Sequence, residues 1–252
     1  MDDPSADAGV AGESDDDTQS SPTAVARALL SATRVGEDPD PQLHRLARFG
    51  DDALERVRTD RRTALAFWVN LYNAGTQLLL SRRPELYESP LRFVRFFRAT
   101  AVTVAGTDLS LDDIENNILR AGRSKYTLGY TRKLRLDPFS RRYRLPEPDP
   151  RIHFALNCGA ASCPAIRFYE PDDVDDQLDL ATALYLDDTV SYDPEAGVAR
   201  VPRVCLWFRG DFGGGDGIRE FLRRYDAIPA DAAPRIRYLP WDWSRAGGKF
   251  AE

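Results

Sequence analysis

The sequence predicts an α+β fold, with several helices packed on a small sheet in one mixed domain. Helical patterns alternate with isolated short strands, such as Val198–Val201 and Arg235–Leu239, without the regular βα period of a parallel sheet. No internal repeat is visible. We therefore expect an acidic tail at 1–22, one domain at 23–245 and a C-terminal tail at 246–252.

Composition limits the classes of protein to which this chain can belong. Its 252 residues are 42% hydrophobic and 10% aromatic, which is ordinary for a globular protein, and the net charge of −6 argues against a nucleic-acid partner. No apolar run approaches the roughly 20 residues of a membrane span, and the N-terminus has no signal-peptide pattern. We expect a soluble, cytoplasmic protein that binds neither nucleic acid nor membrane. Its three cysteines, an odd number, are expected to be free thiols.

The first helical patterns follow a segment with little apolar character. Residues 1–22 are rich in Asp, Ser, Gly and Ala and cannot bury enough surface to fold, so we expect disorder there. Between residues 22 and 57, apolar residues recur at helical-turn spacing, with a Pro-Asp-Pro interruption at 39–41. His44 lies in this region and is expected to be an ordinary helix residue.

Arg61–Ser81 carries the strongest helical pattern, which Pro84 terminates. Asn70, Asn73 and Gln77 follow one narrow face of this helix. Because apolar residues flank the face closely, it is not the solvent side, and its amides need hydrogen-bond partners. The amides either hold neighbouring backbone in place, which we favour, or line a pocket.

A strand and a turn are predicted next. Leu91–Ala101 interleaves Arg with Phe, and we expect its phenylalanines to pack inward while the arginines reach solvent. Ala101–Val104 alternates like a strand and leads to a Gly-Thr-Asp turn at 106–108.

A further helix is predicted over Leu111–Ala121, because Ser110–Asp113 resembles a capping box. This helix contains Glu115, which is either a solvated flank position or a partner of Arg120. Residues 124–150 are basic, rich in Tyr and then rich in Pro, and we expect a long surface connection there.

Residue types that can take part in catalysis are densest in Arg151–Pro164, here called the central stretch, which reads RIHFALNCGAASCP. This stretch holds one of the two histidines, His153, and two of the three cysteines, Cys158 and Cys163. We predict a buried strand over Ile152–Cys158.

The remaining segments predict helices separated by loops. A helix opens at Pro171-Asp172, and a short helix is expected at Val204–Phe208. We interpret Gly213–Gly217 as a flexible loop before a short helix over Ile218–Tyr225. These glycines lack the preceding strand and the Lys-Ser/Thr of a phosphate-binding loop, so nucleotide binding is not expected.

Several phrases together resemble the DUF547 family, a domain of unknown function. They occur at Ala66–Ala74, Leu111–Glu115 running to Arg120, Arg151–Ala160, Ser162–Pro164, Gln177–Thr182, Trp207 with Asp211–Phe212, and Tyr238–Trp243. The resemblance covers about residues 60–245 and implies a coherent fold rather than a reaction. One position departs from it: the family often has a His directly after the Glu of the Ile-Glu phrase, where this chain has Asn116.

The central stretch is also similar to the histidine strand of papain-like and transglutaminase-like hydrolases, in which a His begins an apolar strand that ends at glycine. This similarity is an analogy, and it suggests a thiol hydrolase or acyltransferase. Such chemistry needs a thiolate, a His and an orienting polar group. The candidates are Cys158 or Cys163 as nucleophile, His153 as base, and Glu115, Asn157 or Asn73 as the orienting group.

The two cysteines present different geometries. On a regular strand, His153 and Cys158 point to opposite faces, so a direct pair needs a bulge or strand end near Asn157. Cys163 is the alternative nucleophile. With Ser162 as an N-cap, it would lie at a helix start, where the pKa of a thiol falls.

We expect the pocket to be formed by the His153–Cys163 segment and the helices that carry Asn70 and Glu115. The candidates for substrate binding are Asn70, Asn73, Asn157, Ser162, Arg151 and Asp211. The partner would be a small molecule or a peptide. The competing interpretation is a non-catalytic binding or scaffold domain in which these polar residues lock the fold.

The cysteine spacing does not favour a metal or a cofactor. C-x4-C does not match the compact C-x2-C pairs of structural zinc sites, and we expect neither a metal ion nor a cofactor. A redox role for the two cysteines stays open, although the spacing differs from the C-x-x-C of thioredoxin-like proteins.

Overall fold

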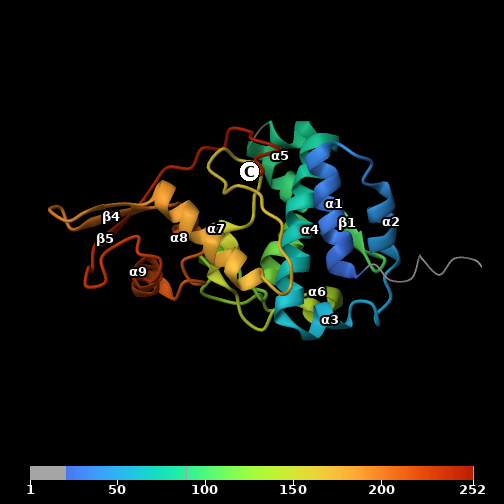
Figure 1. The fold of residues 1–252 in the computed structure, drawn as a ribbon, viewed down its shortest axis with the longest axis horizontal. Helices are drawn as coiled ribbons and strands as arrows, with labels where there is room; N and C mark the ends of the chain where they lie inside the picture. Colours follow the sequence, from blue (N-terminus) through green and yellow to red (C-terminus); the bar gives the residue numbers. More distant parts are fainter. Residues whose placement is uncertain (1–20, 89, 252) are drawn as a thin grey trace, which may run out of the picture.

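A computed structural model of the chain describes residues 21–88 and 90–251. The predicted α+β class is confirmed, because helices dominate and the strands form small sheets (Figure 1). Most of the predicted disordered tail, residues 1–22, lies outside the described residues. At its end, Ser21 caps the first helix and Pro22 begins it.

The α-helices are α1 (Pro22–Val35), α2 (Asp40–Arg48), α3 (Glu55–Thr59), α4 (Arg61–Arg82), α5 (Pro90–Arg98), α6 (Pro138–Tyr143), α7 (Val174–Thr189), α8 (Val204–Trp207) and α9 (Gly214–Arg224). The 3₁₀-helices are η2 (Pro84–Tyr87), η4 (Lys125–Thr127) and η5 (Pro150–Phe154), and η3 (Asp113–Leu119) is a π-helix. The strands are β1 (Thr100–Val104), β2 (Thr107–Ser110), β3 (Ser191–Asp193), β4 (Val198–Val201) and β5 (Arg235–Tyr238). α1 and α2 lie at one end of the molecule and β4, β5 and α9 at the other, while the C-terminal segment returns to the middle, near α5 (Figure 1).

Helix α4 is the buried axis of the larger half of the protein. Asp60 caps it by accepting a hydrogen bond from the Thr63 backbone N–H at 2.8 Å, and every residue from Thr63 to Leu80 is buried. The elements packed around it are α1, α3, α7, β1 and η3, and Figure 1 shows α1 alongside it. Between Thr63 and Leu80 the helix carries no charged side chain, because none of its faces meets solvent.

The strands form two separate sheets. β1 and β2 pair as an antiparallel hairpin, whereas β3, β4 and β5 form a three-stranded sheet in which β4 and β5 are parallel. This second sheet packs with α8, α9 and the end of α7 around a second hydrophobic cluster. Phe154 belongs to that cluster, whereas its neighbours Ile152 and Ala155 belong to the first. The segment around His153 therefore lies where the two clusters meet.

Three predictions from the sequence are wrong. Ile152–Cys158 is not a strand: its first residues belong to η5, which Pro150 begins and the Asp149 side chain caps through the Arg151 N–H. Gly213–Gly217 is not a loop, because α9 begins at Gly214. The stretch 124–150 is not only a surface connection, since it contains η4 and α6 and buries Tyr143 and Leu145.

The helix predicted over Leu111–Ala121 is present but changes character within its length. From Asp113 to Leu119 it is π-helical, and the Arg120 backbone N–H donates to the Glu115 carbonyl at 2.9 Å. Insertions of this kind in helices are frequent at functional sites.

Residues 246–251, in the predicted C-terminal tail, lie against the body of the protein. The Ala246 N–H donates to the Gly159 carbonyl at 2.7 Å, the Ile166 N–H donates to the Lys249 carbonyl at 2.7 Å, and the Phe250 ring stacks on Phe168. This segment therefore covers part of the central stretch.

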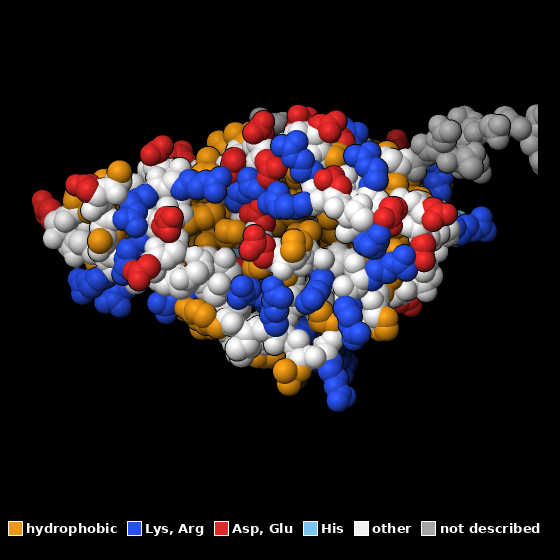
Figure 2. All heavy atoms as spheres, turned by 90° about the horizontal axis from the view of Figure 1, so that it is seen from below, with side chains coloured by type: hydrophobic (Ala, Val, Ile, Leu, Met, Phe, Trp, Pro, Cys, Tyr) orange, Lys and Arg blue, Asp and Glu red, His pale blue; other side chains and the backbone are white. Residues whose placement is uncertain are grey.

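The surface carries charges of both signs. In the view from below, Lys and Arg side chains are interspersed with Asp and Glu, and apolar side chains are exposed between them (Figure 2). None of the helices in residues 21–88 and 90–251 combines the length and apolar character that crossing a bilayer requires.

Candidate functional site

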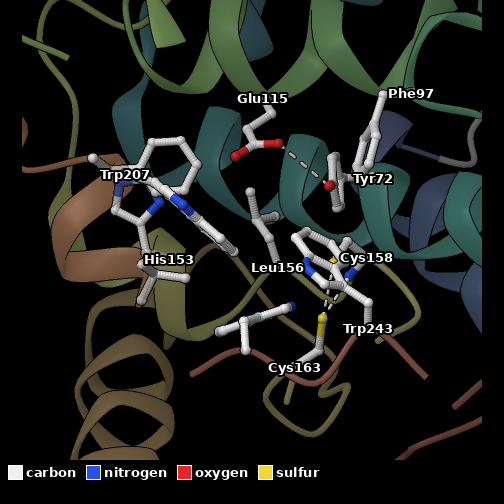
Figure 3. A pocket seen from close by; sticks show the side chains of 12 residues that line it. Tyr72, Phe97, Glu115, His153, Leu156, Cys158, Cys163, Trp207 and Trp243 are labelled. Carbon is white, nitrogen blue, oxygen red and sulfur yellow. Dashed lines mark hydrogen bonds between the residues drawn. The ribbon is translucent and has the colours of Figure 1, made fainter. Parts of the chain in front are cut away.

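A cavity of about 100 Å³, here called the inner chamber, lies between α4, η3, the central stretch and the residues around α8 (Figure 3). Its aromatic walls are Phe97, Trp207, Phe208, Trp241 and Trp243. The polar side chains that reach it are Tyr72, Glu115, His153, Cys158 and Cys163. The structure thus brings together both predicted nucleophiles, the predicted base and the predicted carboxylate.

A second cavity, of about 340 Å³ and here called the outer chamber, adjoins the first. It shares Phe97, Glu115, Trp207, Phe208 and Trp243 with the inner chamber and extends to Asp112, Asn116, Lys125 and Tyr126. The ammonium group of Lys125 binds both oxygens of the Asp112 carboxylate, at 2.8 and 2.5 Å. Glu115 therefore lies on a wall common to both chambers.

The two thiols face each other across a tight turn. Asn157 fixes this turn: its side-chain oxygen accepts from the Gly159 N–H at 2.8 Å and its amide donates to the Pro164 carbonyl at 2.7 Å. Gly159 has a φ of +87°, and a Cβ there would lie 2.7 Å from the Leu80 side chain. The turn leaves the Sγ atoms of Cys158 and Cys163 3.0 Å apart.

Cys163 is the sulfur that the surroundings favour as a thiolate. Burial raises the pKa of the Cys163 thiol, but hydrogen bonds from the Cys158 thiol and backbone N–H and the nearby Lys249 ammonium lower it by more, so its pKa is below the ordinary value. The Cys158 thiol has the opposite shift: donation to Cys163 and burial raise its pKa well above the ordinary value. The predicted helix start at Ser162-Cys163 is absent. Hydrogen bonds from Cys158, and not a helix N-terminus, therefore lower the pKa of the Cys163 thiol.

His153 is held by a buried ionic network. Its Nε2 lies 3.0 Å from Oδ2 of Asp211, and Asp211 in turn accepts two hydrogen bonds from Arg120, at 2.5 and 3.1 Å. Because a carboxylate only accepts hydrogen bonds, Nε2 carries the proton and Nδ1 is left as an acceptor. Burial lowers the pKa of His153 although Asp211 opposes the shift, so the ring is neutral at pH 7.

Phe208 completes the support of this network. The His153 ring stacks on Phe208 with the ring centroids 4.1 Å apart, and the Arg120 guanidinium lies 4.3 Å from the same ring centroid. The orientation of the imidazole is therefore fixed both by stacking and by the Asp211 hydrogen bond.

Glu115 is a carboxyl group with an unusual pKa. Burial raises the pKa of Glu115 to about 7, although Arg120 opposes the shift. Tyr72 donates a hydrogen bond from its hydroxyl to Oε2 of Glu115 at 3.3 Å (Figure 3). A carboxyl group with a pKa near neutrality suits proton donation and acceptance.

His153 and the thiols do not form a direct dyad. Leu156 lies between them in Figure 3, with His153 and Trp207 on one side and the cysteines and Trp243 on the other. Within the described part of the chain, no hydrogen bond joins His153 to either thiol. Any proton transfer between the two walls must pass through a bound molecule or water.

The predicted amides are structural clamps rather than pocket residues. Asn70 bonds the carbonyl and the N–H of Tyr169, at 2.8 and 3.1 Å. Asn73 donates to the Ala155 carbonyl at 3.0 Å and accepts from the Asn157 N–H at 2.9 Å. The favoured interpretation of this helix face, amides that hold backbone in place, is thus confirmed, and the proposed role in substrate binding has no support in these contacts.

Two further predicted binding residues lie away from the chambers. Arg151 forms ion pairs with Asp149 and Asp175, each at 2.6 Å. Ser162 accepts a hydrogen bond from the Asp242 N–H at 2.9 Å. Arg151 therefore anchors the start of α7, and Ser162 holds the segment that carries the tryptophan walls.

Several residues of the site are not predicted from the sequence. Tyr72 lies on α4 within an apolar helical pattern that is equally typical of a core residue, and nothing in the sequence places Trp207, Phe208, Trp241 and Trp243 at a pocket. Asn116, the departure from the family pattern, bonds Arg120 and Asp112, so it connects the buried network to the outer chamber. Within the described residues, no three His, Cys, Asp or Glu side chains cluster as metal ligands.

Comparison with known proteins identifies a family but no activity. A family model described as "Protein of unknown function, DUF547" matches residues 57–186. The matched region includes α4, η3 and the whole central stretch. No curated protein and no solved structure matches the chain.

Proposed function

The chain belongs to the DUF547 family, and we propose that it is a thiol-dependent acyl hydrolase or acyltransferase with Cys163 as the nucleophile. The observations that carry the proposal are the contact of the two Sγ atoms at 3.0 Å and the hydrogen bond that Cys163 accepts from the Cys158 N–H at 3.2 Å. They favour a thiolate on the wall of a chamber that also contains a base and an acid. In the cytoplasmic setting predicted from the sequence, both thiols would stay reduced.

In the first step, the Cys163 thiolate attacks the carbonyl carbon of an ester, thioester or amide. The leaving group departs from the tetrahedral intermediate and takes a proton from Glu115, whose raised pKa of about 7 suits this donation. The product is a thioester between the acyl group and Cys163.

In the second step, water or another acceptor attacks this thioester. His153 takes the proton of the attacking group at Nδ1, since Nε2–H is bonded to Asp211. The acceptor would occupy the space between the two walls, which is consistent with the lack of a direct bond between His153 and the thiols. Cys163 is released as a thiolate.

The chambers indicate the size and character of the substrate. An engineered apolar cavity of about 150 Å³ holds benzene, so the inner chamber of about 100 Å³ suits a short acyl group between aromatic walls. The outer chamber, of about 340 Å³ and bordered by Asp112 and Lys125, suits the polar remainder. A small molecule or the end of a peptide chain meets both requirements.

Acylation of the protein by a short-chain thioester of N-acetylcysteamine tests the proposal. Intact-protein mass spectrometry should find one acyl group, and peptide mapping should locate it on Cys163. Cys163→Ser should lose the adduct, whereas Cys205→Ser is the matched control, because Cys205 is buried in the second cluster and burial raises the pKa of its thiol to about 12. Equal acylation of wild type and Cys163→Ser would contradict the proposal.

A non-catalytic binding or scaffold domain is the second candidate. The engagement of Asn70, Asn73 and Asn157 in backbone clamps favours it, because three family residues then serve the fold alone. The two candidates differ in the same experiment: a scaffold with inert thiols acquires no acyl group from any thioester, at any pH at which it stays folded.

A further inference from the structure

The Cys158–Cys163 pair has a geometry that acyl transfer does not require. A single nucleophilic cysteine suffices for that chemistry, yet two sulfur atoms lie 3.0 Å apart here. A disulfide bond is about 2.05 Å long, so the two sulfurs need to approach by only about 1 Å. We propose that this pair is a reversible oxidation site, which forms an intramolecular disulfide on reaction with a small hydroperoxide.

The turn that joins the cysteines is already closed in the reduced protein. The Cys163 N–H donates to the Ala160 carbonyl at 3.0 Å, and the two side-chain bonds of Asn157 hold both ends of the turn. The Cys158 N–H also points at the Cys163 sulfur, at 3.2 Å. Bond formation therefore requires little loss of conformational freedom, which is the main obstacle for a distant pair of thiols.

A hydroperoxide can reach the pair. Both sulfurs line the inner chamber, and Cys158 is partly exposed whereas Cys163 is buried against the turn. The chamber volume of about 100 Å³ exceeds the roughly 30 Å³ that a water molecule occupies in the liquid, so hydrogen peroxide or a short alkyl hydroperoxide fits. A large oxidant such as glutathione disulfide does not fit a chamber of about 100 Å³.

The reaction balances in two steps. The Cys163 thiolate attacks the terminal oxygen of the hydroperoxide, which gives a sulfenic acid on Cys163 and an alkoxide that leaves as the alcohol after taking a proton from Glu115. The Cys158 thiol then displaces hydroxide from the sulfenic sulfur, and the hydroxide leaves as water with the Cys158 proton. Two thiols are oxidised, and the hydroperoxide is reduced to an alcohol and water.

The consequence for activity rests on the proposed function, because a disulfide removes the thiolate that would attack the acyl group. Oxidation would then stop acyl transfer, and a thiol reductant would restore it. The disulfide itself does not depend on that function, since its formation needs only the two sulfurs and the oxidant.

Oxidation of the reduced full-length protein tests the inference. The protein is treated with a few equivalents of tert-butyl hydroperoxide, its remaining thiols are alkylated, and intact mass and peptide mapping are recorded without reductant. We expect the loss of two hydrogens per chain, a Cys158–Cys163 linkage, and full reversal by dithiothreitol. Cys205→Ser should behave like wild type, because Cys205 lies in the second cluster.

Two variants separate the steps. Cys158→Ser should stop at the sulfenic acid on Cys163, which dimedone traps, and Cys163→Ser should form no intramolecular disulfide. Direct conversion of wild-type Cys163 to sulfinic acid, or a linkage between different chains, would overturn the inference. A disulfide in a protein that no thioester acylates would retain the inference and reject the acyl-transfer function. Acylation of Cys163 without formation of a disulfide would reject the inference and retain the acyl-transfer function.

Discussion

Arg120 and Asp211 form a two-point ion pair in which both side chains are completely buried. One end of the pair is fixed by Asn116 and the other holds His153. A charge pair of this kind is costly to bury but more costly to break, because the surviving charge has no partner and no water. The network therefore makes the orientation of His153 part of the stability of the fold.

Replacement of Asp211 by Asn should reveal this coupling. The free energy of unfolding is expected to fall by about 3–5 kcal/mol, because Arg120 keeps its charge without a counterion. Asp51→Asn is the matched control, since it removes an exposed ion pair with Arg142 whose contribution is about 0–1 kcal/mol. Urea denaturation followed by tryptophan fluorescence measures both, and similar small losses in the two variants would contradict the assignment.

Glu115 should make the stability depend on pH. Burial raises its pKa from 4.5 to about 7, so the folded protein binds this proton more tightly than the unfolded chain does. The resulting stabilisation is complete below about pH 4.5 and is lost as the pH rises to about 7, by at most about 3.5 kcal/mol at about 1.4 kcal/mol per pKa unit. Glu115→Gln should lack this decline, as judged by urea unfolding at several pH values. The control variant Glu195→Gln, at an exposed position, should lose stability with rising pH in the same way as wild type.

The reactivity of Cys163 should depend on the donor at position 158. Cys158→Val removes the thiol donor but keeps the backbone N–H, so the pKa of Cys163 should rise. Cys158→Ser keeps a hydroxyl donor and should shift it less. The pH dependence of iodoacetamide labelling, read for each cysteine by mass spectrometry, measures the shift. Identical labelling profiles in both variants and in wild type would show that Cys158 does not activate Cys163.

Gly217 should be intolerant of any side chain. A Cβ at this position would lie 1.8 Å from the Phe212 carbonyl oxygen, so Gly217→Ala must displace the backbone that carries Asp211. We expect a loss of about 1–3 kcal/mol or more. Gly50→Ala is the control, because a Cβ at Gly50 meets nothing within 4 Å, and its effect should be neutral or slightly stabilising. Thermal denaturation of the two variants makes the comparison.

The sequence predicted the long elements well, for physical reasons. α4 has a pattern of 22 residues with clear start and stop signals, and the buried amides of that helix need hydrogen-bond partners. This requirement favours Asn70 and Asn73 as clamps over a place on the wall of a pocket, and the contacts of the folded chain decide between the two. The class of fold also follows, because long helices and short isolated strands exclude a regular βα arrangement.

Two short segments were assigned the wrong secondary structure. Ile152–Cys158 has the composition of a buried strand, but the Asp-Pro pair at 149–150 begins a short 3₁₀-helix that contains His153. The glycines at 213–217 look like a flexible loop, yet Gly217 is required by the close approach of Phe212 to the start of α9. In both cases the decisive contact is local and depends on backbone geometry, which composition alone cannot reveal.

The sequence predicted which residues gather at the chamber better than it predicted the hydrogen bonds between them. His153, Cys158, Cys163 and Glu115 do meet at one chamber. The partner of His153 is 58 residues away, and no spacing rule pairs it with Asp211 in the sequence. The pairing of the two thiols with each other, rather than with His153, depends on a turn that the strand prediction did not allow.

The contact between the C-terminal segment and the central stretch has a consequence for synthesis on the ribosome. Lys249, which donates to the Cys163 carbonyl at 2.6 Å, is 86 residues later in the chain, and at about 5–20 residues per second the interval between them is roughly 4–17 s. Throughout that interval the nascent polypeptide carries both thiols without the segment that later covers their turn. The newborn chain is thus the form most open to unwanted thiol chemistry, and synthesis of the segment around Lys249 ends this exposure.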